Sequence, residues 1–281
     1  MTDLADLALT TVRVERADSI VHVVLNRPDR LNAQTPRMWR ELADLGRVLV
    51  DDNAIRVVVV RGEGRAFSSG LDTSVFADGL FDAPEFANAP DRGARDPDPF
   101  IDSVLRAQDA FSWLETAPFV TIAALHGYAL GAGLQIALAC DLRVATRSLQ
   151  CGLLEFRYGI LPDLGATQRL PQLVGLGKAK ELILTAATID GEEAYRIGLV
   201  EQLVADDALD SSVVALAERC AAQPPIAVRG TKQALHAAGR VPIDAGLRIE
   251  AEGQRACMNS ADMREALSAY VEQRAPRFTG H

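Results

Sequence analysis

Alternation of apolar and polar residues marks the beginning of the chain. In "TVRVERADSIVHVVLNRP", Val12 and Val14 flank a polar residue, and Val21, Val23 and Leu25 follow with His22 inside the run. A period of two is typical of strands that bury one face. These two runs predict a hairpin that opens the fold.

The period changes to that of a helix after Thr35. Thr35 can serve as the N-cap and Pro36 suits the first helical position, and apolar residues recur at helical spacing at Met38, Leu42, Leu45 and Leu49. The β-branched run at 57–60, closed by two glycines, predicts a buried strand. Strand, helix and strand in this order predict a parallel crossover.

The remaining pattern divides the chain into an α/β part and a helical part. Residues 76–100 are rich in Asp, Pro, Gly and Ala without sustained periodicity, which predicts a long loop and a candidate lid. Helices are expected at 101–115 and 177–188, and strands at 119–127 and near 141–150. Asp190 with Glu193 three residues later indicates a capping box. We therefore expect an α/β core over residues 1–205 and a C-terminal helical region over 206–281.

Composition restricts the classes of partner. The chain has 281 residues, is 48% hydrophobic and carries a formal net charge of −9 with no block of like charge, which argues against nucleic-acid binding. No apolar run approaches the roughly 20 residues that span a bilayer, and the N-terminal stretch lacks the features of a secretion signal, so we expect a cytoplasmic protein without membrane contact. The four cysteines are scattered, which predicts buried thiols and no metal site.

Small residues gather in the stretch "HGYALGAGLQIALACD". Gly131, Ala132 and Gly133 form a turn before an apolar helix, where a ligand oxygen can approach free backbone N–H groups. Tight packing between strand and helix is the alternative explanation of such a turn. A second small-residue turn, "GRAFSSGLD", follows the buried strand, and the N–H of Leu71 could point at the same oxygen. Two donors on one oxygen would form an oxyanion hole.

Six motifs in order carry a resemblance to a known family. They are "LNRPDRLNAQTP", "GRAFSSGLD", "HGYALGAGLQIALACDLRVAT", "LLEFRYGILPDLGATQRLP", "GEEAYRIGLV" and "YVEQRAPRF", and together they cover about residues 12–278. In this order and spacing they resemble the enoyl-CoA hydratase/isomerase (crotonase) superfamily. The resemblance implies a spiral of ββα units that holds an acyl-CoA site, and C-terminal helices that form a homotrimer or, as two trimers, a homohexamer. It also implies that the N–H groups of Leu71 and Ala132 bind the thioester oxygen.

The resemblance points to two catalytic positions, and only one of them carries the family's glutamate in this chain. Hydratases of this family hold the attacking water between two glutamates, of which the second corresponds to Glu155 and the first is replaced by Gln135. A carboxamide can orient water but cannot take its proton. Gln135 is therefore either an amide that orients water or substrate, or a buried amide satisfied by the backbone. For Glu155 the alternative is a surface charge at a strand end, and any rise of its pKa would have to come from burial.

Asp163, in "ILPDLG", occupies a position that is acidic in the dienoyl-CoA isomerase branch of the family. Moving a double bond requires one group to take a proton and the same or another group to return it elsewhere, and no water is consumed. Glu155 and Asp163 could divide this task. The alternative is a turn aspartate that caps nearby backbone.

The coenzyme part of the ligand is expected to contact several positions that match the family pattern. Tyr270 and Arg274 on the last helix could reach a CoA of a neighbouring subunit, although Arg274 could equally belong to a solvated face. The acyl group is expected to contact Phe76, Leu80, Phe81 and the 77–104 loop. The other candidate binding residues are Arg30, Leu31, Ser69, Asp72 and Gly131.

We therefore expect an enzyme that hydrates or isomerises enoyl-CoA thioesters, with acyl-CoA as its substrate and no cofactor. The family favours the lyase label, whereas the residues favour isomerisation. The alternatives are an acyl-CoA thioester or carbon–carbon bond hydrolase of the same superfamily, and an acyl-CoA-binding protein without catalysis.

Overall fold

The computed structural model describes residues 4–76 and 96–281. In this part of the chain a six-stranded sheet has the order β1-β2-β3-β4-β6-β9. β1 and β2 form the expected antiparallel hairpin, and the other neighbouring strands pair in parallel. The strands are β1 Val12–Ala17, β2 Ile20–Leu25, β3 Val57–Gly62, β4 Val120–Leu125, β6 Leu142–Thr146 and β9 Gln202–Val204. A smaller sheet, in the order β5-β7-β8, contains β5 Tyr128–Leu130, β7 Gln150–Gly152 and β8 Thr188–Asp190.

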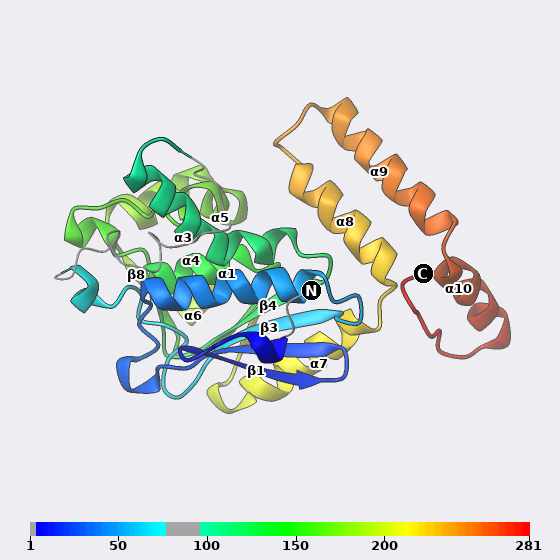
Figure 1. Ribbon diagram of the computed structural model, residues 1–281, viewed down its shortest axis with the longest axis horizontal. Helices are drawn as coiled ribbons and strands as arrows, with labels where there is room; N and C mark the ends of the chain where they lie inside the picture. The colour runs from blue at the N-terminus through cyan, green and yellow to red at the C-terminus, as the bar shows by residue number, and fades with distance from the viewer. Residues whose placement is uncertain (1–3, 77–95) are drawn as a thin grey trace.

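Helices cover both faces of the large sheet (Figure 1). Val58 and Val60 of β3 belong to the core shared with α1 Pro36–Val50, α3 Pro99–Thr116 and α4 Ala132–Ala139. Val57 and Val59 belong to a second core with α7 Leu209–Ala221 on the opposite face. This burial on both faces explains why the run at 57–60 is continuously apolar rather than alternating.

The expected helix start at Thr35 is confirmed, because its side chain accepts a hydrogen bond from Met38 N at 3.3 Å. Of the two hydrogen bonds of the capping box predicted at Asp190, the one accepted by the Asp190 side chain is confirmed. Asp190 Oδ1 accepts from Glu193 N at 2.8 Å, but the Glu193 carboxylate pairs with Arg196. The helix that follows is α6 Gly191–Arg196.

Two expected boundaries were wrong. The strand predicted near 141–150 is two strands in different sheets, because a turn after Thr146 carries the chain from β6 to β7. The helix predicted at 177–188 is the second part of α5 Ala166–Leu184, after an interruption at Gly175 (φ 77°, ψ 155°), and it ends at Leu184 rather than at Thr188. Its last predicted residue, Thr188, begins β8 because it pairs with Gly152.

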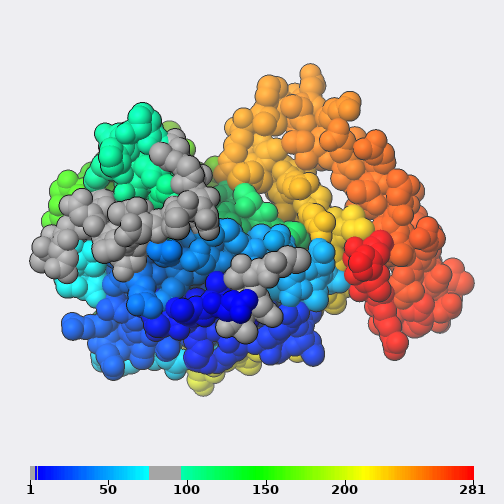
Figure 2. All heavy atoms as spheres, in the orientation of Figure 1, coloured from blue at the N-terminus to red at the C-terminus, as the bar shows by residue number. Residues whose placement is uncertain are grey.

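The C-terminal helices form an arm that projects from the core, orange to red in Figures 1 and 2. It contains α8 Pro225–Ala237, α9 Ile243–Met258 and α10 Ala261–Glu272. The helical content expected after residue 206 is therefore confirmed, while the domain boundary itself stays a prediction. Among the described residues, no helix has the length and apolar character needed to cross a membrane.

Five short 3-10 helices accompany the main elements of the described chain. Two of them border the candidate site described below, η3 and η4. Their bounds are η1 Leu4–Asp6, η2 Pro28–Arg30, η3 Thr73–Phe76, η4 Glu155–Tyr158 and η5 Asp206–Ala208.

Candidate active site

The two small-residue turns predicted from the sequence lie against each other. Ser68 N donates to Tyr128 O at 2.8 Å, and Leu130 N donates to Ser68 O at 3.0 Å. A Cβ on Gly133 would lie 2.4 Å from Ser68 O, and one on Gly70, whose φ is +96°, would lie 2.7 Å from Leu130 O. Glycine is therefore required at both positions for the turns to come this close.

The amides of Leu71 and Ala132 are both available to a ligand. Ala132 is the first residue of α4, so its N–H has no acceptor within the helix. Within the described residues, neither amide donates a hydrogen bond to the backbone. A Cβ on Gly70 would lie 3.7 Å from Ala132 N, which places the second turn next to the start of α4.

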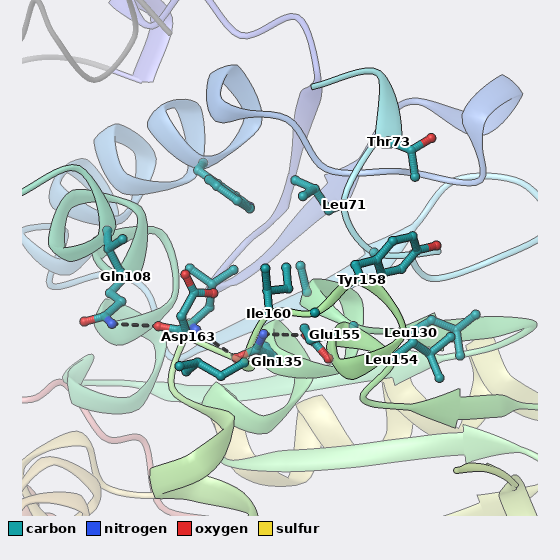
Figure 3. A pocket seen from close by; sticks show the side chains of 18 of the residues that line it. Leu71, Thr73, Gln108, Leu130, Gln135, Leu154, Glu155, Tyr158, Ile160 and Asp163 are labelled. Carbon is teal, nitrogen blue, oxygen red and sulfur yellow. Dashed lines mark hydrogen bonds between the residues drawn. The ribbon is translucent and has the colours of Figure 1, made fainter. Parts of the chain in front are cut away.

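Leu71 and Ala132 both line a cavity of about 760 Å³, whose lining consists mainly of apolar side chains. In Figure 3, Leu71 lies on one side of this cavity and Glu155 and Asp163 lie on the other. The helix α3 contributes Phe100, Ile101, Val104 and Leu105. The end of the predicted 77–104 loop therefore lines the cavity as part of a helix, whereas Leu80 and Phe81 lie outside the described residues.

Glu155 is buried at the cavity wall rather than exposed at a strand end. Its residue exposure is 8%, and a Cβ on Gly131 would lie 3.4 Å from its Oε1. Gln135 Nε2 donates to this Oε1 at 2.8 Å. Glu155 Oε2 is buried and has no hydrogen-bond partner among the described residues. One carboxylate oxygen is thus held by the protein and the other is left for a ligand.

Gln135 is a buried amide satisfied on its oxygen by the backbone. Its Oε1 accepts from Leu164 N at 2.9 Å and from Ala166 N at 3.2 Å. Both lone pairs of the amide oxygen are therefore occupied, and the remaining contact to a cavity ligand is the second Nε2–H. The sequence predicted either an amide that orients a ligand or a buried amide satisfied by the backbone. The hydrogen bonds to Oε1 agree with the second alternative, and Nε2 has an additional partner in Glu155.

Both acidic side chains of the cavity have raised pKa values. Burial raises the pKa of Glu155, and the nearby charge of Asp163 adds to this rise, while the hydrogen bond from Gln135 opposes it. Burial likewise raises the pKa of Asp163. A carboxyl group whose pKa approaches the working pH can both take and return a proton. Perturbed carboxyls in a cleft are typical of catalytic sites.

Asp163 contributes to the cavity through a turn that Gln108 supports. Gln108 Nε2 donates to the backbone oxygen of Asp163 at 2.6 Å (Figure 3). Gln108 and Trp39 line the cavity but were not predicted as site residues. Gln108 lies one helical turn after Val104, and that spacing is the signal that could have identified it.

The expected coenzyme-binding residues fall into two groups. Ser69 lines the cavity, and its N–H donates to Leu31 O at 2.9 Å, so the Arg30–Leu31 turn adjoins the cavity edge. Arg30 is exposed. The Asp72 carboxylate, in contrast, accepts hydrogen bonds from Ser74 Oγ at 2.8 Å and Ser74 N at 3.1 Å and pairs with Arg27 at 2.9 Å. These contacts lower the pKa of Asp72 although partial burial raises it. Asp72 therefore supports the turn that presents Leu71.

Tyr270 and Arg274 do not reach this cavity within one chain. Tyr270 belongs to α10, the last helix of the C-terminal arm (Figure 1), and Arg274 follows this helix by two residues. Tyr270 is 84% exposed, and Arg274 pairs with Glu265 and Glu272, each at 2.6 Å. Their expected contact with a coenzyme of a neighbouring subunit stays a prediction.

The enoyl-CoA hydratase/isomerase family model matches residues 15–281. The chain belongs to this family. The crotonyl-CoA hydratase of Syntrophomonas wolfei is 32% identical over 274 residues, which cover 97% of this chain and 99% of the relative. The peroxisomal Delta(3,5)-Delta(2,4)-dienoyl-CoA isomerase of Arabidopsis thaliana is 32% identical over 271 residues, 96% of each chain.

The enoyl-CoA hydratase/isomerase fold is also shared with solved structures. A Thermobifida fusca YX protein in complex with acetoacetyl-CoA is 40% identical, with a TM-score of 0.80 over 90% of this chain and 96% of that one. The expected fold class, a crotonase-like α/β core with a helical C-terminal region, is confirmed. A hydratase and an isomerase of this family thus match the chain at the same identity, 32%. In the described residues, no group of three or more His, Cys, Asp or Glu side chains could hold a metal ion.

Proposed function

We propose that this chain acts on enoyl-CoA thioesters and moves a proton along the acyl chain, with Glu155 as the principal acid and base. The observation that carries the proposal is the Glu155 carboxyl. Its Oε2 is buried without a partner among the described residues, its pKa is raised, and the carboxyl lies beside Gly131, where the two small-residue turns with the open amides of Leu71 and Ala132 meet. Family membership and the apolar cavity support an acyl thioester as the substrate.

In the proposed reaction, the thioester oxygen accepts hydrogen bonds from the N–H groups of Leu71 and Ala132. Removing a proton next to the thioester moves negative charge onto this oxygen. Donors fixed in place for such a charge are worth roughly 3–4 kcal/mol each in other oxyanion holes. Since Ala132 donates through its main chain, the methyl group of its side chain does not prevent this role.

For a 3-enoyl thioester, the ionised Glu155 takes a proton from C2. The electrons of the broken C–H bond delocalise over the dienolate and its thioester oxygen. A protonated carboxyl then delivers a proton to C4, which leaves the double bond between C2 and C3. Glu155 or Asp163 can supply that proton, since burial raises the pKa of both. No water and no cofactor are consumed.

Isomerisation is favoured over hydration by the hydrogen bonds of Gln135. A hydratase with two carboxylates can take the proton of water on either one, whereas the Gln135 oxygen already accepts from the amides of Leu164 and Ala166. Hydration stays the second candidate, because the free Nε2–H of Gln135 can still orient a water molecule beside Glu155.

We further propose that the CoA portion lies along the cavity edge near Arg30, Leu31 and Ser69, and that the chain assembles as a trimer or hexamer. The support for assembly is the apolar surface of the C-terminal arm, where Tyr270 is 84% and Val271 80% exposed. Other exposed apolar residues of the arm are Leu235, Ile243, Leu247, Met258 and Leu267. An exposed apolar surface of this extent is typical of an interface.

The test is to incubate the protein with crotonyl-CoA, a 3-enoyl-CoA and a 3,5-dienoyl-CoA in water enriched in oxygen-18, with products identified by mass spectrometry. A shifted double bond without heavy oxygen supports isomerisation. Heavy oxygen in a 3-hydroxyacyl-CoA supports hydration. Release of free CoA, measured by thiol titration, would identify a hydrolase. Tight acyl-CoA binding without turnover, unaffected by Glu155→Gln, would indicate a binding protein and contradict the proposal.

A further inference from the structure

A chain of polar contacts leads from Glu155 out of the cavity to the C-terminal end of α8. Its central residue is Arg169, on α5. The side chain of Arg169 is only 10% exposed, and its Nε pairs with Glu115 Oε2 at 3.0 Å. Its Nη1 donates to Leu164 O at 3.0 Å. No role of Arg169 follows from the resemblance or from the comparisons.

Arg169 binds the carbonyl oxygen of the peptide that joins Leu164 to Gly165. The peptides directly before and after it carry the N–H groups of Leu164 and Ala166, and both of these donate to Gln135 Oε1. Gly165 has a φ of +104°, and a Cβ there would lie 2.0 Å from Arg169 Nη1. Arg169 therefore packs directly on this turn.

The turn determines which way the Gln135 amide faces. Two N–H donors point at one end of the amide, so that end has to be its oxygen, and a flipped amide would set N–H against N–H. The nitrogen consequently faces Glu155 and donates to Oε1 at 2.8 Å. This leaves Oε2 as the carboxylate oxygen available to a substrate.

Glu115 fixes the outer end of the chain of contacts. Besides Arg169, it accepts from Arg240 Nη2 at 2.7 Å and lies 3.2 Å from His236 Nδ1. Its carboxylate thus joins α3 and α5 to the end of α8. The ion pair between Arg169 and Glu115, whose side chains are 10% and 24% exposed, has a more defined geometry than an ion pair on the surface.

We propose that Arg169 is a positioning residue that orients Glu155 through the 164–166 turn and Gln135. This inference rests on the proposed role of Glu155 as acid and base. Arg169 touches neither the cavity ligand nor the reacting atoms in this proposal. Its removal should therefore lower kcat more than it changes KM.

The experiment is a double-mutant cycle between Arg169→Met and Gln135→Met, with turnover of a 3-enoyl-CoA as the readout. Misplacing a catalytic group by about 1 Å can cost on the order of 100-fold. We expect Arg169→Met alone to lower kcat by about 10- to 100-fold with KM changed by less than about threefold. In the Gln135→Met background the same change should cost less than about threefold, because the intermediate partner is already gone.

Lys232→Met is the matched control. Lys232 is a cation of similar exposure, 12%, that pairs with Asp141 at 2.7 Å and donates to Phe119 O, away from the 164–166 turn. It should lower the melting temperature as Arg169→Met does. Its effect on kcat should be small and equal in both backgrounds.

Equal losses of kcat from Arg169→Met in both backgrounds, or a full kcat in the folded variant, would overturn the inference. If Arg169→Met does not fold, Arg169→Lys takes its place in the cycle. It keeps the charge but not the forked contact with Glu115 and Leu164 O. Failure of the proposed function is recognised separately, because Glu155→Gln would then retain turnover. If Glu155→Gln is inactive while Arg169→Met is fully active, only the positioning role is wrong.

Discussion

Replacing Gln135 with glutamate tests the most specific feature of the site, the amide that donates to the Glu155 carboxylate. The substitution keeps an acceptor for the amides of Leu164 and Ala166. It also replaces the N–H that donates to Glu155 Oε1, at 2.8 Å, with a second carboxylate oxygen.

The energetic consequence follows from this short distance. Two unit charges 2.8 Å apart repel by about 6 kcal/mol at an effective dielectric constant of about 20. The two carboxyls therefore share one proton at neutral pH and titrate as a coupled pair. A pair that shares one proton can take a proton from water and deliver another to the substrate. Isomerisation needs the ionised form of Glu155 to take the C2 proton, and the shared proton makes that form scarcer.

The assay compares wild type and Gln135→Glu on crotonyl-CoA and on a 3-enoyl-CoA across a range of pH. We expect water addition to crotonyl-CoA to rise by about tenfold or more and isomerisation at neutral pH to fall by about tenfold, which are changes typical of general acid–base catalysis. The acidic limb of the isomerisation profile should move to higher pH. Gln135→Met is the uncharged control and should impair both reactions. Unchanged or reduced hydration in Gln135→Glu, with an unchanged pH profile, would refute the assignment of roles.

Four further outcomes are expected. Glu155→Gln should reduce turnover by about 10²- to 10⁴-fold and Asp163→Asn by a smaller factor, and normal steady-state rates in both variants would contradict the proton-transfer roles. Glu155→Gln should also stabilise the protein. Burial raises the pKa of Glu155 above its usual 4.5, so the folded state binds this proton more tightly than the unfolded state, and stability falls as the pH rises from about 4.5 through the raised pKa. The gain in melting temperature from Glu155→Gln should thus appear above this window and vanish below about pH 4.5, and a pH-independent gain would disprove the explanation. Gly133→Ala should destabilise by about 1–3 kcal/mol in chemical denaturation, because its Cβ would lie 2.4 Å from Ser68 O, and an unchanged unfolding midpoint would show that the turns can separate. Arg30→Ala should raise the Kd for CoA by about tenfold in calorimetry, as expected for the loss of a charged contact, and equal affinity would place the coenzyme elsewhere.

The local elements of this fold were predictable because their signals lie within a few neighbouring residues. The hairpin of Val12 to Leu25, the Thr35 cap and the buried strand at 57–60 each depend on periodicity or on a single capping contact. The helix predicted at 177–188 was wrong at its C-terminal end, because the structure ends it at Leu184. The pairing of Thr188 with Gly152, residues far apart in sequence, overrides local helical spacing.

The family, the two small-residue turns and the candidates Glu155, Gln135 and Asp163 could all be predicted from the sequence. The contacts among these residues depend on the tertiary fold. The Gln135 amide is oriented by Leu164 and Ala166, 29 and 31 residues away, and no spacing rule predicts such contacts. Burial, which raises the pKa of Glu155, is likewise a property of the packed cavity, because desolvation depends on what surrounds a charge and not on its neighbours in sequence.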